Sequence, residues 1–322
     1  MKSTFAIFAS LALTCGLANP AAAQGYPNKP VKVMVAFPAG GSADIVSRIV
    51  MQKVSDQMNQ AFVIENKPGA GGNIAFDAAS KADPDGYTLM LSTPGVVINP
   101  TLRQKTTNYT PDDFIGIYLV GEAPLLIMSN PNVKANSLAE LITLAKQKPG
   151  SIRYASAGAG SSSHLATEVF RHLAGLELVH IPYKGGGPAF QDVINGTVEI
   201  TSLPIAESLA MVASGRVRAL AQTGTRRSAI APDIPTVAQA GVPGYNITTW
   251  YVLLAPAKTP PDIVAKLAAE MDKAVKSPDV REKLQKAGVD IIGNGPDKTG
   301  PFMKEEFAKY AKLLKEAGVK IE

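Results

Sequence analysis

The stretch Val33–Arg48, VMVAFPAGGSADIVSR, decides the fold, because it predicts a strand, a loop of small residues and a helix in direct succession. Five apolar residues, Val33–Phe37, end at Pro38 and are typical of a strand that is covered on both faces. The loop that follows, Ala39–Gly41, has almost no side chains, so a ligand can approach its backbone N–H groups closely.

The helix after this loop offers an anion site at its first turn. Ser42 is expected to be its N-cap, and Asp44 lies where a carboxylate interacts favourably with the helix dipole. We interpret Asp44 as such a dipole partner rather than as a ligand contact. Because the first N–H groups of a helix have no intrahelical acceptor, the pattern predicts that a small anionic molecule binds here.

The residues before this strand, 1–23, predict a signal peptide. Lys2 gives a basic start, Phe5–Leu17 is mostly apolar, and Ala21–Ala23 fits the small-residue cleavage pattern. The apolar segment is too short for a membrane span, which takes about 20 residues. We therefore expect cleavage after Ala23 and export of the mature chain.

Cys15, the single cysteine, lies inside this segment and leaves a lipid-anchored protein as an alternative. Ala12 and Thr14 are poor neighbours for lipid attachment, so we favour cleavage. The mature chain then has no cysteine, and at about 300 residues it is large enough to fold without disulfides.

Composition argues against several classes of protein. The formal net charge of the 322 residues is +5, or +4 without Lys2, and no run of lysine or arginine with interleaved aromatics is present. We therefore expect no nucleic-acid partner. No apolar segment after residue 23 is long enough to cross a membrane. The length indicates two domains or one large one.

Strands alternate with helices along the whole chain, which predicts an α/β protein with mainly parallel sheets. The expected strands are Val31–Phe37, Ala61–Glu65, Tyr87–Ser92, Ser151–Ser156, Leu178–Pro182, Val198–Ser202, Val217–Thr223 and Thr248–Ala255. The expected helices are Ala43–Met58, Asn73–Lys81, one from Ser137 to before Pro149, His164–Leu173, Ala189–Asn195, Ser208–Ser214, Asp262–Val275, Pro278–Ala287 and Pro301–Ala317. The long apolar segment Ile115–Met128 is interpreted as a passage between domains.

The opening pattern recurs about 120 residues later. Ser151–Ser156 predicts a strand, Ala157–Gly160 a loop of small residues, and Ser161–Ser163 the start of a helix. Because ligands of open α/β sheets bind at the carboxyl ends of strands, two such loops on facing domains would form one cleft. The anionic end of the ligand then faces the first loop, the second, or both.

A third glycine loop, Tyr183–Pro188, follows the next expected strand. Lys184 offers a cation to a ligand there. The segment is equally typical of a strand-to-helix turn with a surface lysine, and the sequence leaves both interpretations open.

Five segments, taken together and in this order, resemble the Bordetella uptake gene (Bug) family, or TctC family, of periplasmic receptors of tripartite tricarboxylate transporters. They are FPAGGSADIVSRIV, NKPGAGGNIAFDAASKADPDGYTLM, YASAGAGSSSHLATEVF, HIPYKGGGPAFQDVINGTVEI and TTWYVLLAPAKTPPDIVAKL. The resemblance extends from about Tyr26 to the C-terminus. It implies a two-domain, type II-like periplasmic binding protein with a ligand cleft between the domains. We expect domain 1 to comprise residues 24–122 and 245–322, and domain 2 residues 123–244.

The resemblance also implies how the ligand is held: loops of both domains bind a carboxylate through backbone amides and ordered waters. The implied ligand-binding residues are Phe37, Ala39, Gly40, Gly41 and Ser42 in the first loop, Ala157, Gly158, Ser161 and Ser162 in the second, Ser92 and Thr93 at a strand end, and Trp250 in the wall near the hinge.

The ligands of this family are small carboxylates, including di- and tricarboxylates and acidic amino acids, and some members take uncharged or aromatic molecules. Many relatives carry an aromatic–Asp–Asn stretch near Thr201–Pro204, where this chain has no acid. If that aspartate recognises an amine, its absence favours a di- or tricarboxylate or a related acid over an amino acid.

The expected function is capture of a small carboxylate by domain closure and delivery to the membrane subunits of a transporter, in the periplasm. We expect a monomer without cofactor, metal or catalytic residues. One alternative is a periplasmic sensor, since it would use the same closure to signal to a partner. A hydrolase built on Ser161–His164 is less plausible, because the G-x-S-x-G spacing is absent. The mature chain also lacks H-E-x-x-H and cysteine, so a metal site has little support.

Overall fold

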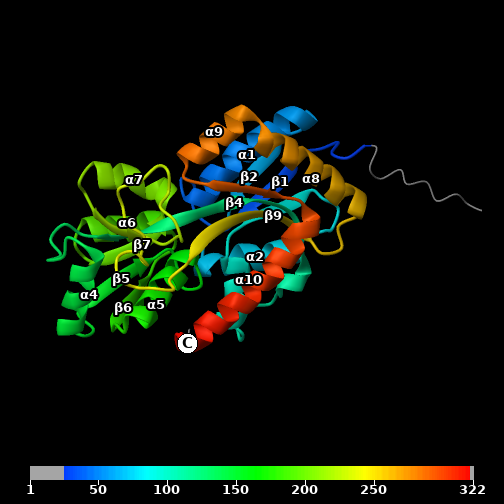
Figure 1. Cartoon of the computed structure of the whole chain (residues 1–322). Coiled ribbons are helices and arrows are strands. Elements are labelled where there is room, and N and C mark those ends of the chain that lie inside the picture. The colour runs from blue at the N-terminus through cyan, green and yellow to red at the C-terminus, as the bar shows by residue number, and fades with distance from the viewer. Residues whose placement is uncertain (1–24, 320–322) are drawn as a thin grey trace, which may run out of the picture.

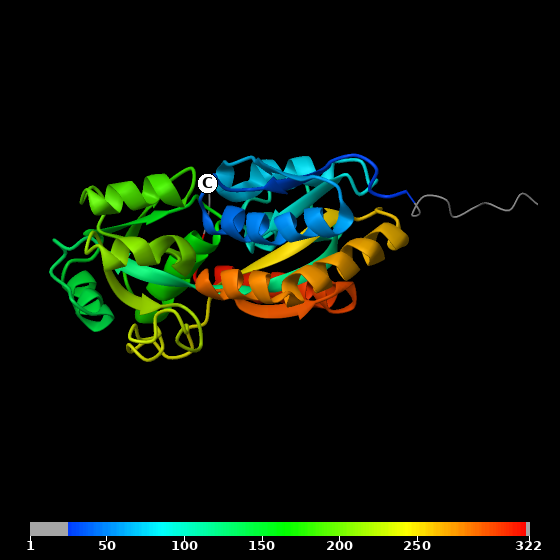
Figure 2. The ribbon, with the colours of Figure 1, turned by 90° about the horizontal axis from the view of Figure 1, so that it is seen from above.

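The computed structural model describes residues 25–319, so the predicted signal peptide lies outside the described residues. Two lobes lie side by side, and strands run from one into the other (Figures 1 and 2). Within the described residues, ten strands are connected by pairing: eight follow the order β2-β1-β3-β9-β4-β7-β5-β6, and β8 and β10 each pair with β4 outside this order.

Lobe 1 is formed by the two ends of the chain. Its strands are β1 (Val31–Val35), β2 (Phe62–Asn66), β3 (Thr88–Ser92), β9 (Thr248–Pro256), β10 (Asp290–Asn294) and the first part of β4 (Phe114–Ser129). Its helices are α1 (Ser42–Met58), α2 (Asn73–Ser80), α3 (Gly95–Leu102), α8 (Pro261–Lys276), α9 (Pro278–Lys286) and α10 (Pro296–Glu316), with the short 3-10 turns η1 (Ala70–Gly72) and η2 (Pro111–Asp113).

Lobe 2 is formed by the middle of the chain. Its strands are the last part of β4, β5 (Ile152–Ser156), β6 (Leu178–Pro182), β7 (Ile200–Pro204) and β8 (Arg218–Gln222). Its helices are α4 (Leu138–Gln147), α5 (Ser162–Ala174), α6 (Gly186–Ile194) and α7 (Ile205–Ala213).

The strand path is buried between helices on both sides. One apolar cluster joins the strands to α1, α6 and α8, and the second joins them to α2, α5 and α10. Strand β1 shows why: four of its five residues are buried, so it must be covered on both faces. Helix α1 meets it with Val46, Val50 and Val54, which lie one turn apart on one side of the helix.

Strand β4 carries the chain from lobe 1 to lobe 2. It pairs with β10 up to Glu122 and with β9 up to Pro124, and from Leu125 it pairs with β7 and β8. Strand β9 lies beside it at the crossing, where Glu122 is opposite Trp250 and Pro124 is opposite Thr248. The two strands therefore form an antiparallel ribbon between the lobes. The domain boundaries predicted at 122/123 and 244/245 stay a prediction.

The sequence prediction of mainly parallel sheets is only half right. Strands β1, β2 and β3 are parallel, as are β5, β6 and β7, but β4 and β9 run antiparallel to their neighbours. Helix α3 and strand β10 were not predicted. Helix α10 begins at Pro296 rather than Pro301, since Pro301 falls near its start and removes few helical hydrogen bonds.

The start of α1 also differs from the prediction. Gly41 is the N-cap, and Ser42 is the first helical residue, with no side-chain cap at this end. In the second copy of the pattern the prediction of a hydroxyl cap is correct: the Oγ of Ser161 accepts a hydrogen bond from the backbone N–H of His164, 3.3 Å away.

Candidate functional site

A cavity of about 260 Å³ lies between the lobes, at the carboxyl ends of β1 and β5. Its wall is made by the first loop, by the starts of α1, α5 and α6, and by one side of α7. The lining residues are Phe37, Pro38, Ala39, Gly40, Gly41, Ser42, Ala43, Thr93, Ala157, Ser161, Ser162, Ser163, Gly186, Gly187, Phe190, Gln191, Pro204, Glu207, Met211 and Thr249.

Most residues that the sequence nominated for the ligand line this one cavity. They are Phe37, Ala39, Gly40, Gly41, Ser42, Thr93, Ala157, Ser161 and Ser162. The structure brings the two predicted loops together although they are far apart in the sequence. That these residues bind a ligand stays a prediction.

Three of the predicted ligand-binding residues, Ser92, Gly158 and Trp250, do not line the cavity. Ser92 is fully buried and its Oγ donates to the carbonyl of Thr93. Gly158 packs against the backbone of Gly71 in lobe 1.

Trp250 does not form part of the wall, which corrects the sequence expectation. It is fully buried, its Nε1 donates to Glu306 over 2.9 Å, and its ring packs edge-on against Phe302 of α10. Successive side chains of a strand point to opposite faces, and the preceding residue, Thr249, is the one that lines the cavity. The expectation was therefore wrong by one position along β9.

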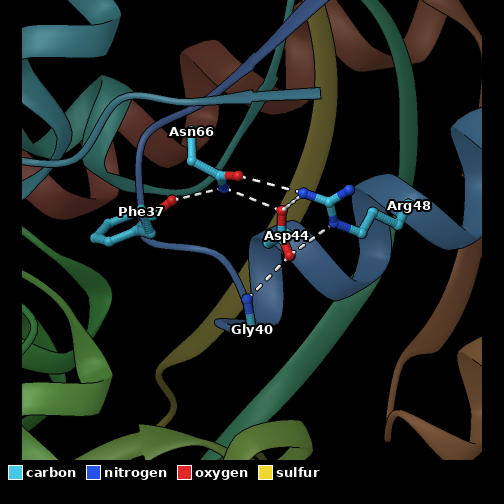
Figure 3. A network of polar contacts seen from close by, with 5 residues as sticks. All are labelled: Phe37, Gly40, Asp44, Arg48 and Asn66. Carbon is cyan, nitrogen blue, oxygen red and sulfur yellow. Dashed lines mark hydrogen bonds and ion pairs between the residues drawn. The ribbon is translucent and has the colours of Figure 1, made fainter. Parts of the chain in front are cut away.

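Asp44 holds the first loop in place (Figure 3). Its Oδ2 accepts hydrogen bonds from the backbone N–H of Gly40 at 3.0 Å and from Arg48, and its Oδ1 accepts one from Asn66. The same Asn66 amide donates to the carbonyl of Phe37, at the other end of the loop. Asp44 is thus more than a partner of the helix dipole, because it occupies the N–H of Gly40 and ties the loop to the end of β2.

The charge of Asp44 is stabilised within this network. Burial alone would raise its pKa, but the hydrogen bonds from Arg48, Gly40 and Asn66 outweigh burial and hold the pKa below its usual range. The carboxylate stays ionised and paired with Arg48 at neutral pH. It therefore fixes the loop without presenting a free negative charge to a ligand.

Side chains hold the second loop as well. The N–H of Ala157 donates to Ser163, that of Gly158 to Ser156, and that of Gly160 to His164. The glycine-loop amides that the sequence predicted as ligand contacts are therefore largely occupied within the protein.

The N–H groups left for a ligand are those that open the helices. Ser42 and Ala43 open α1, and Ser162 and Ser163 open α5, so their N–H groups have no intrahelical acceptor. All four residues line the cavity, two from each lobe. Such paired helix N-termini favour an anion, most simply a carboxylate.

Thr93 gives a second, independent sign of a ligand. It is only 4% exposed, it lines the cavity, and its Oγ1 has no hydrogen-bond partner among residues 25–319. A buried hydroxyl without a partner is unusual and costs free energy unless a ligand or water supplies the bond.

His164 packs inside lobe 2 and does not form a hydrolytic pair with Ser161. The ring of His164 is buried and stacks on His180, which stacks on Tyr154. Its Nδ1 accepts from Gly160, so its proton lies on Nε2. The Oγ of Ser161 contacts the backbone of His164 and not its ring, so the arrangement that a Ser161–His164 hydrolase needs is absent from this site.

We expect His164 and His180 to make the free energy of unfolding depend on pH in the acidic range. Burial lowers the pKa of His164 to about 3 and that of His180 to about 4. Below pH 6.5 the unfolded chain binds protons on both while the folded chain does not, so stability falls as the pH falls toward 4. The loss is up to about tenfold in the folding equilibrium constant per pH unit for each histidine.

Urea unfolding at pH 7 and pH 5 measures this effect. His164→Asn keeps an acceptor for Gly160 but removes the titrating ring, and is expected to lower the pH dependence. His172→Asn, at an exposed position of α5, is the matched control and should leave it unchanged. An equal pH dependence in all three proteins would contradict the prediction.

For the third glycine loop, Tyr183–Pro188, the structure favours a strand-to-helix turn with a surface lysine. Gly186 and Gly187 line the cavity, whereas Lys184 is exposed and is not part of the lining. The loop therefore contributes backbone at the start of α6.

Several lining residues were not foreseen from the sequence, chief among them Glu207, Thr249 and Phe190. Glu207 lies in the first turn of α7, directly after β7. The same rule that located the two loops, a helix start after a strand end, applies to it. Glu207 was not predicted as a site residue because no glycine loop lies between β7 and α7.

No helix among residues 25–319 is both long and apolar enough to traverse a membrane. The described part of the chain also contains no cluster of three or more His, Cys, Asp or Glu side chains arranged to hold a metal ion.

Comparison with known families gives one match. Residues 46–319 match the family described as the tripartite tricarboxylate transporter family receptor. Protein BugT of Bordetella pertussis is 34% identical over 329 residues, an alignment that covers 100% of this chain and 99% of BugT.

Several solved structures are similar to this chain in fold and in sequence. A protein of R. palustris with adipate has a TM-score of 0.88 at 33% identity, covering 92% of this chain and 99% of the other. The periplasmic binding protein BugD has a TM-score of 0.87 at 31% identity, covering 92% and 100%. MatC of Rhodopseudomonas palustris, with bound malate, has a TM-score of 0.83 at 29% identity, covering 90% and 100%.

Proposed function

Because the chain belongs to the tripartite tricarboxylate transporter receptor family, we propose that it captures a small carboxylate in the periplasm by closing two domains around it. The family and the two-domain α/β fold of periplasmic binding proteins confirm the sequence prediction. The family is one of solute-binding receptors, not of enzymes.

The observation that carries the proposal is the set of open donors around the cavity. Helix N-termini from both lobes present N–H groups, and the buried Oγ1 of Thr93 lacks a partner in the described chain. Two relatives of the same fold are solved with adipate and with malate, which are carboxylates. A carboxylate of the ligand accepts hydrogen bonds from these donors, so no positively charged side chain has to be buried in the cavity to hold it.

Closure follows from the division of these donors between the lobes. Each helix terminus contributes about 0.3–1 kcal/mol at an exposed site and up to ~2 in partly buried geometry. A hydrogen bond to a charged group adds about 1.5–3 kcal/mol. Only the closed form makes all of these contacts, so the ligand stabilises closure through its higher affinity for that form.

The remaining parts of the proposal concern the cell. We propose that the mature chain begins after Ala23, acts as a monomer, and presents its closed form to the membrane subunits of a transporter. Domain 1 would comprise residues 24–122 and 245–322, and domain 2 residues 123–244. A pull-down of the detergent-solubilised membrane subunits, with and without ligand, tests the delivery step.

A thermal-shift screen of small acids tests ligand binding. Adipate, malate, succinate, citrate, aspartate and glutamate are suitable probes. A ligand at 100 times its dissociation constant adds about 2.7 kcal/mol, which is expected to raise Tm by roughly 5 °C. Thr93→Val is nearly isosteric and should lower this shift without lowering the Tm of the empty protein. A rise in Tm with neutral or cationic molecules only would contradict the proposal.

A further inference from the structure

Glu207 is a carboxyl group in the cavity wall. It lies in the first turn of α7, and its oxygens face Gly186 at the start of α6. Across the cleft they face Gly41 of lobe 1: a side-chain carbon at that glycine would lie 3.7 Å from Oε2. Among residues 25–319 neither a hydrogen bond nor an ion pair reaches this carboxyl, although well-partnered carboxylates such as Asp44 lie close by in the fold.

Among the residues that line the cavity no side chain is positively charged, and the N-terminus of α6 supplies Glu207 only with the partial positive charge of a helix start. Every other residue that lines the cavity is uncharged. The facing residues of α1 and α6 are glycines, and Tyr251 of β9 is the titratable group that faces Glu207 from the sheet. The hydroxyl of Tyr251 is buried and has no hydrogen-bond partner in the part of the chain that the structure describes. Burial raises the pKa of Glu207 to about 8.

The cavity therefore offers two kinds of polar group, and Glu207 lies close to Gly41, the N-cap of α1. The helix N-termini and serine hydroxyls suit a carboxylate, Glu207 suits a donor or a cation, and Phe37, Phe190 and Met211 line the space around them. A plain dicarboxylate would place a second negative charge in a cavity whose one ionisable lining group is an acid. A ligand with one carboxylate and one ammonium satisfies both the helix N-termini and Glu207.

Resting on the proposed function, we propose that Glu207 makes this site selective for small acids that carry a protonated amine, which it binds as an ion pair. The ligand's carboxylate lies at the helix N-termini of α1 and α5. The segment Thr201–Pro204, which lacks an acid, lies in the buried strand β7 and its end. Glu207 supplies an acid three residues later, so the argument from that segment against an amino acid loses its force.

Isothermal titration with matched pairs of acids tests the proposal. The pairs are succinate and aspartate, glutarate and glutamate, and butyrate with 2-aminobutyrate and 4-aminobutyrate. The wild-type protein is expected to bind the amino member of at least one pair at least tenfold more tightly. Glu207→Gln should weaken that binding at least 30-fold and leave the plain acid within about threefold. Glu305→Gln, at an exposed position of α10, is the matched control and should change neither.

The pH dependence of binding gives a second readout with a defined sign. An ammonium binds to ionised Glu207, so the affinity of the amino acid ligand should rise with pH from 6 to 8, by up to tenfold per unit. Glu207→Gln should abolish this rise. If protonated Glu207 instead donates to a plain dicarboxylate, affinity falls over the same range and the glutamine variant retains it, which overturns the inference.

The outcomes separate this inference from the proposed function. Equal binding of both members of every pair, unchanged in Glu207→Gln, overturns the role of Glu207 and leaves the carboxylate receptor intact. Binding of none of these acids, with binding of neutral molecules in their place, overturns the carboxylate receptor itself. In each titration the Tm of the empty protein shows whether the variant is folded.

Discussion

Alanine at position 71 is expected to weaken ligand binding at least a hundredfold while both lobes stay folded. Gly71 lies in η1 of lobe 1, with φ of +64°, and a side-chain carbon there would overlap the carbonyl oxygen of Ala159 in lobe 2. The same carbonyl accepts a hydrogen bond from Arg103 of lobe 1 over 3.1 Å. This point is therefore where the backbones of the two lobes meet.

We expect Gly71→Ala to weaken binding rather than folding, because the added side chain overlaps with an atom of the other lobe and not with an atom of its own lobe. An open arrangement relieves it, whereas the closed arrangement, with donors from both lobes around the cavity, forces the two backbones apart. Dissociation constants from isothermal titration with a carboxylate found in the thermal-shift screen measure the loss.

Gly150→Ala separates the overlap from backbone strain. Gly150 has nearly the same conformation, with φ of +72°, but no atom lies near its missing side chain. Both alanines should cost about 1 kcal/mol of folding stability from the left-handed backbone. Only Gly71→Ala should lose ligand affinity. Equal affinity in the two variants would show that the lobes do not approach each other at Gly71 when ligand is bound.

Removing the Asp44 carboxylate is expected to lower the free energy of unfolding by about 3 kcal/mol. Asp44→Ala removes the acceptor of the Gly40 N–H, the carboxylate partner of Arg48 and one of the two acceptors of the Asn66 amide. Because Gly40 and Asn66 hold the first loop, ligand affinity should fall about tenfold as well. Urea unfolding and titration measure the two losses.

Asp77→Ala is the control for this prediction. Asp77 forms the same kind of pair with a base four residues on, Lys81, but on the solvated side of α2. Such a pair is worth about 0.5 kcal/mol. The pKa of Asp44 is lowered, so its contribution is present at neutral pH and disappears only as the pH falls below the usual range of an aspartate. A similar loss of stability in both variants would mean that the loop does not depend on Asp44.

Much of the fold could be predicted because local patterns agree with the tertiary structure. The strand and helix of Val33–Arg48 and their second copy at Ser151–Leu173 combine an apolar run, small residues and an amphipathic helix, and each was found. Strand β10 was missed because its residues are half-buried and lack a continuous apolar run. Helix α3 was missed because Pro94 precedes it and Pro100 lies within it, and prolines are typical of loops.

The site was predictable where it depends on topology and unpredictable where it depends on orientation. Strand ends followed by helices located both loops. The choice between Thr249 and Trp250 depends on which face of β9 meets the cavity, and the sequence alternation around them does not distinguish the faces. Glu207 required knowledge of which helix faces lobe 1 across the cleft. The occupied N–H of Gly40 required the position of Asp44 relative to the loop.

The paired strands β4 and β9 determine how many ways the lobes can move. The two strands that cross from one lobe to the other are paired with each other at the crossing. Residues 122–124 of β4 lie opposite residues 248–250 of β9. Shear along this ribbon would break its ladder, whereas bending across it keeps the ladder intact. We therefore expect the two lobes to move relative to each other mainly by bending of this ribbon, so that one angle between the lobes describes the motion. A single interlobe distance, measured between two labels, would then follow occupancy of the site as a continuous variable.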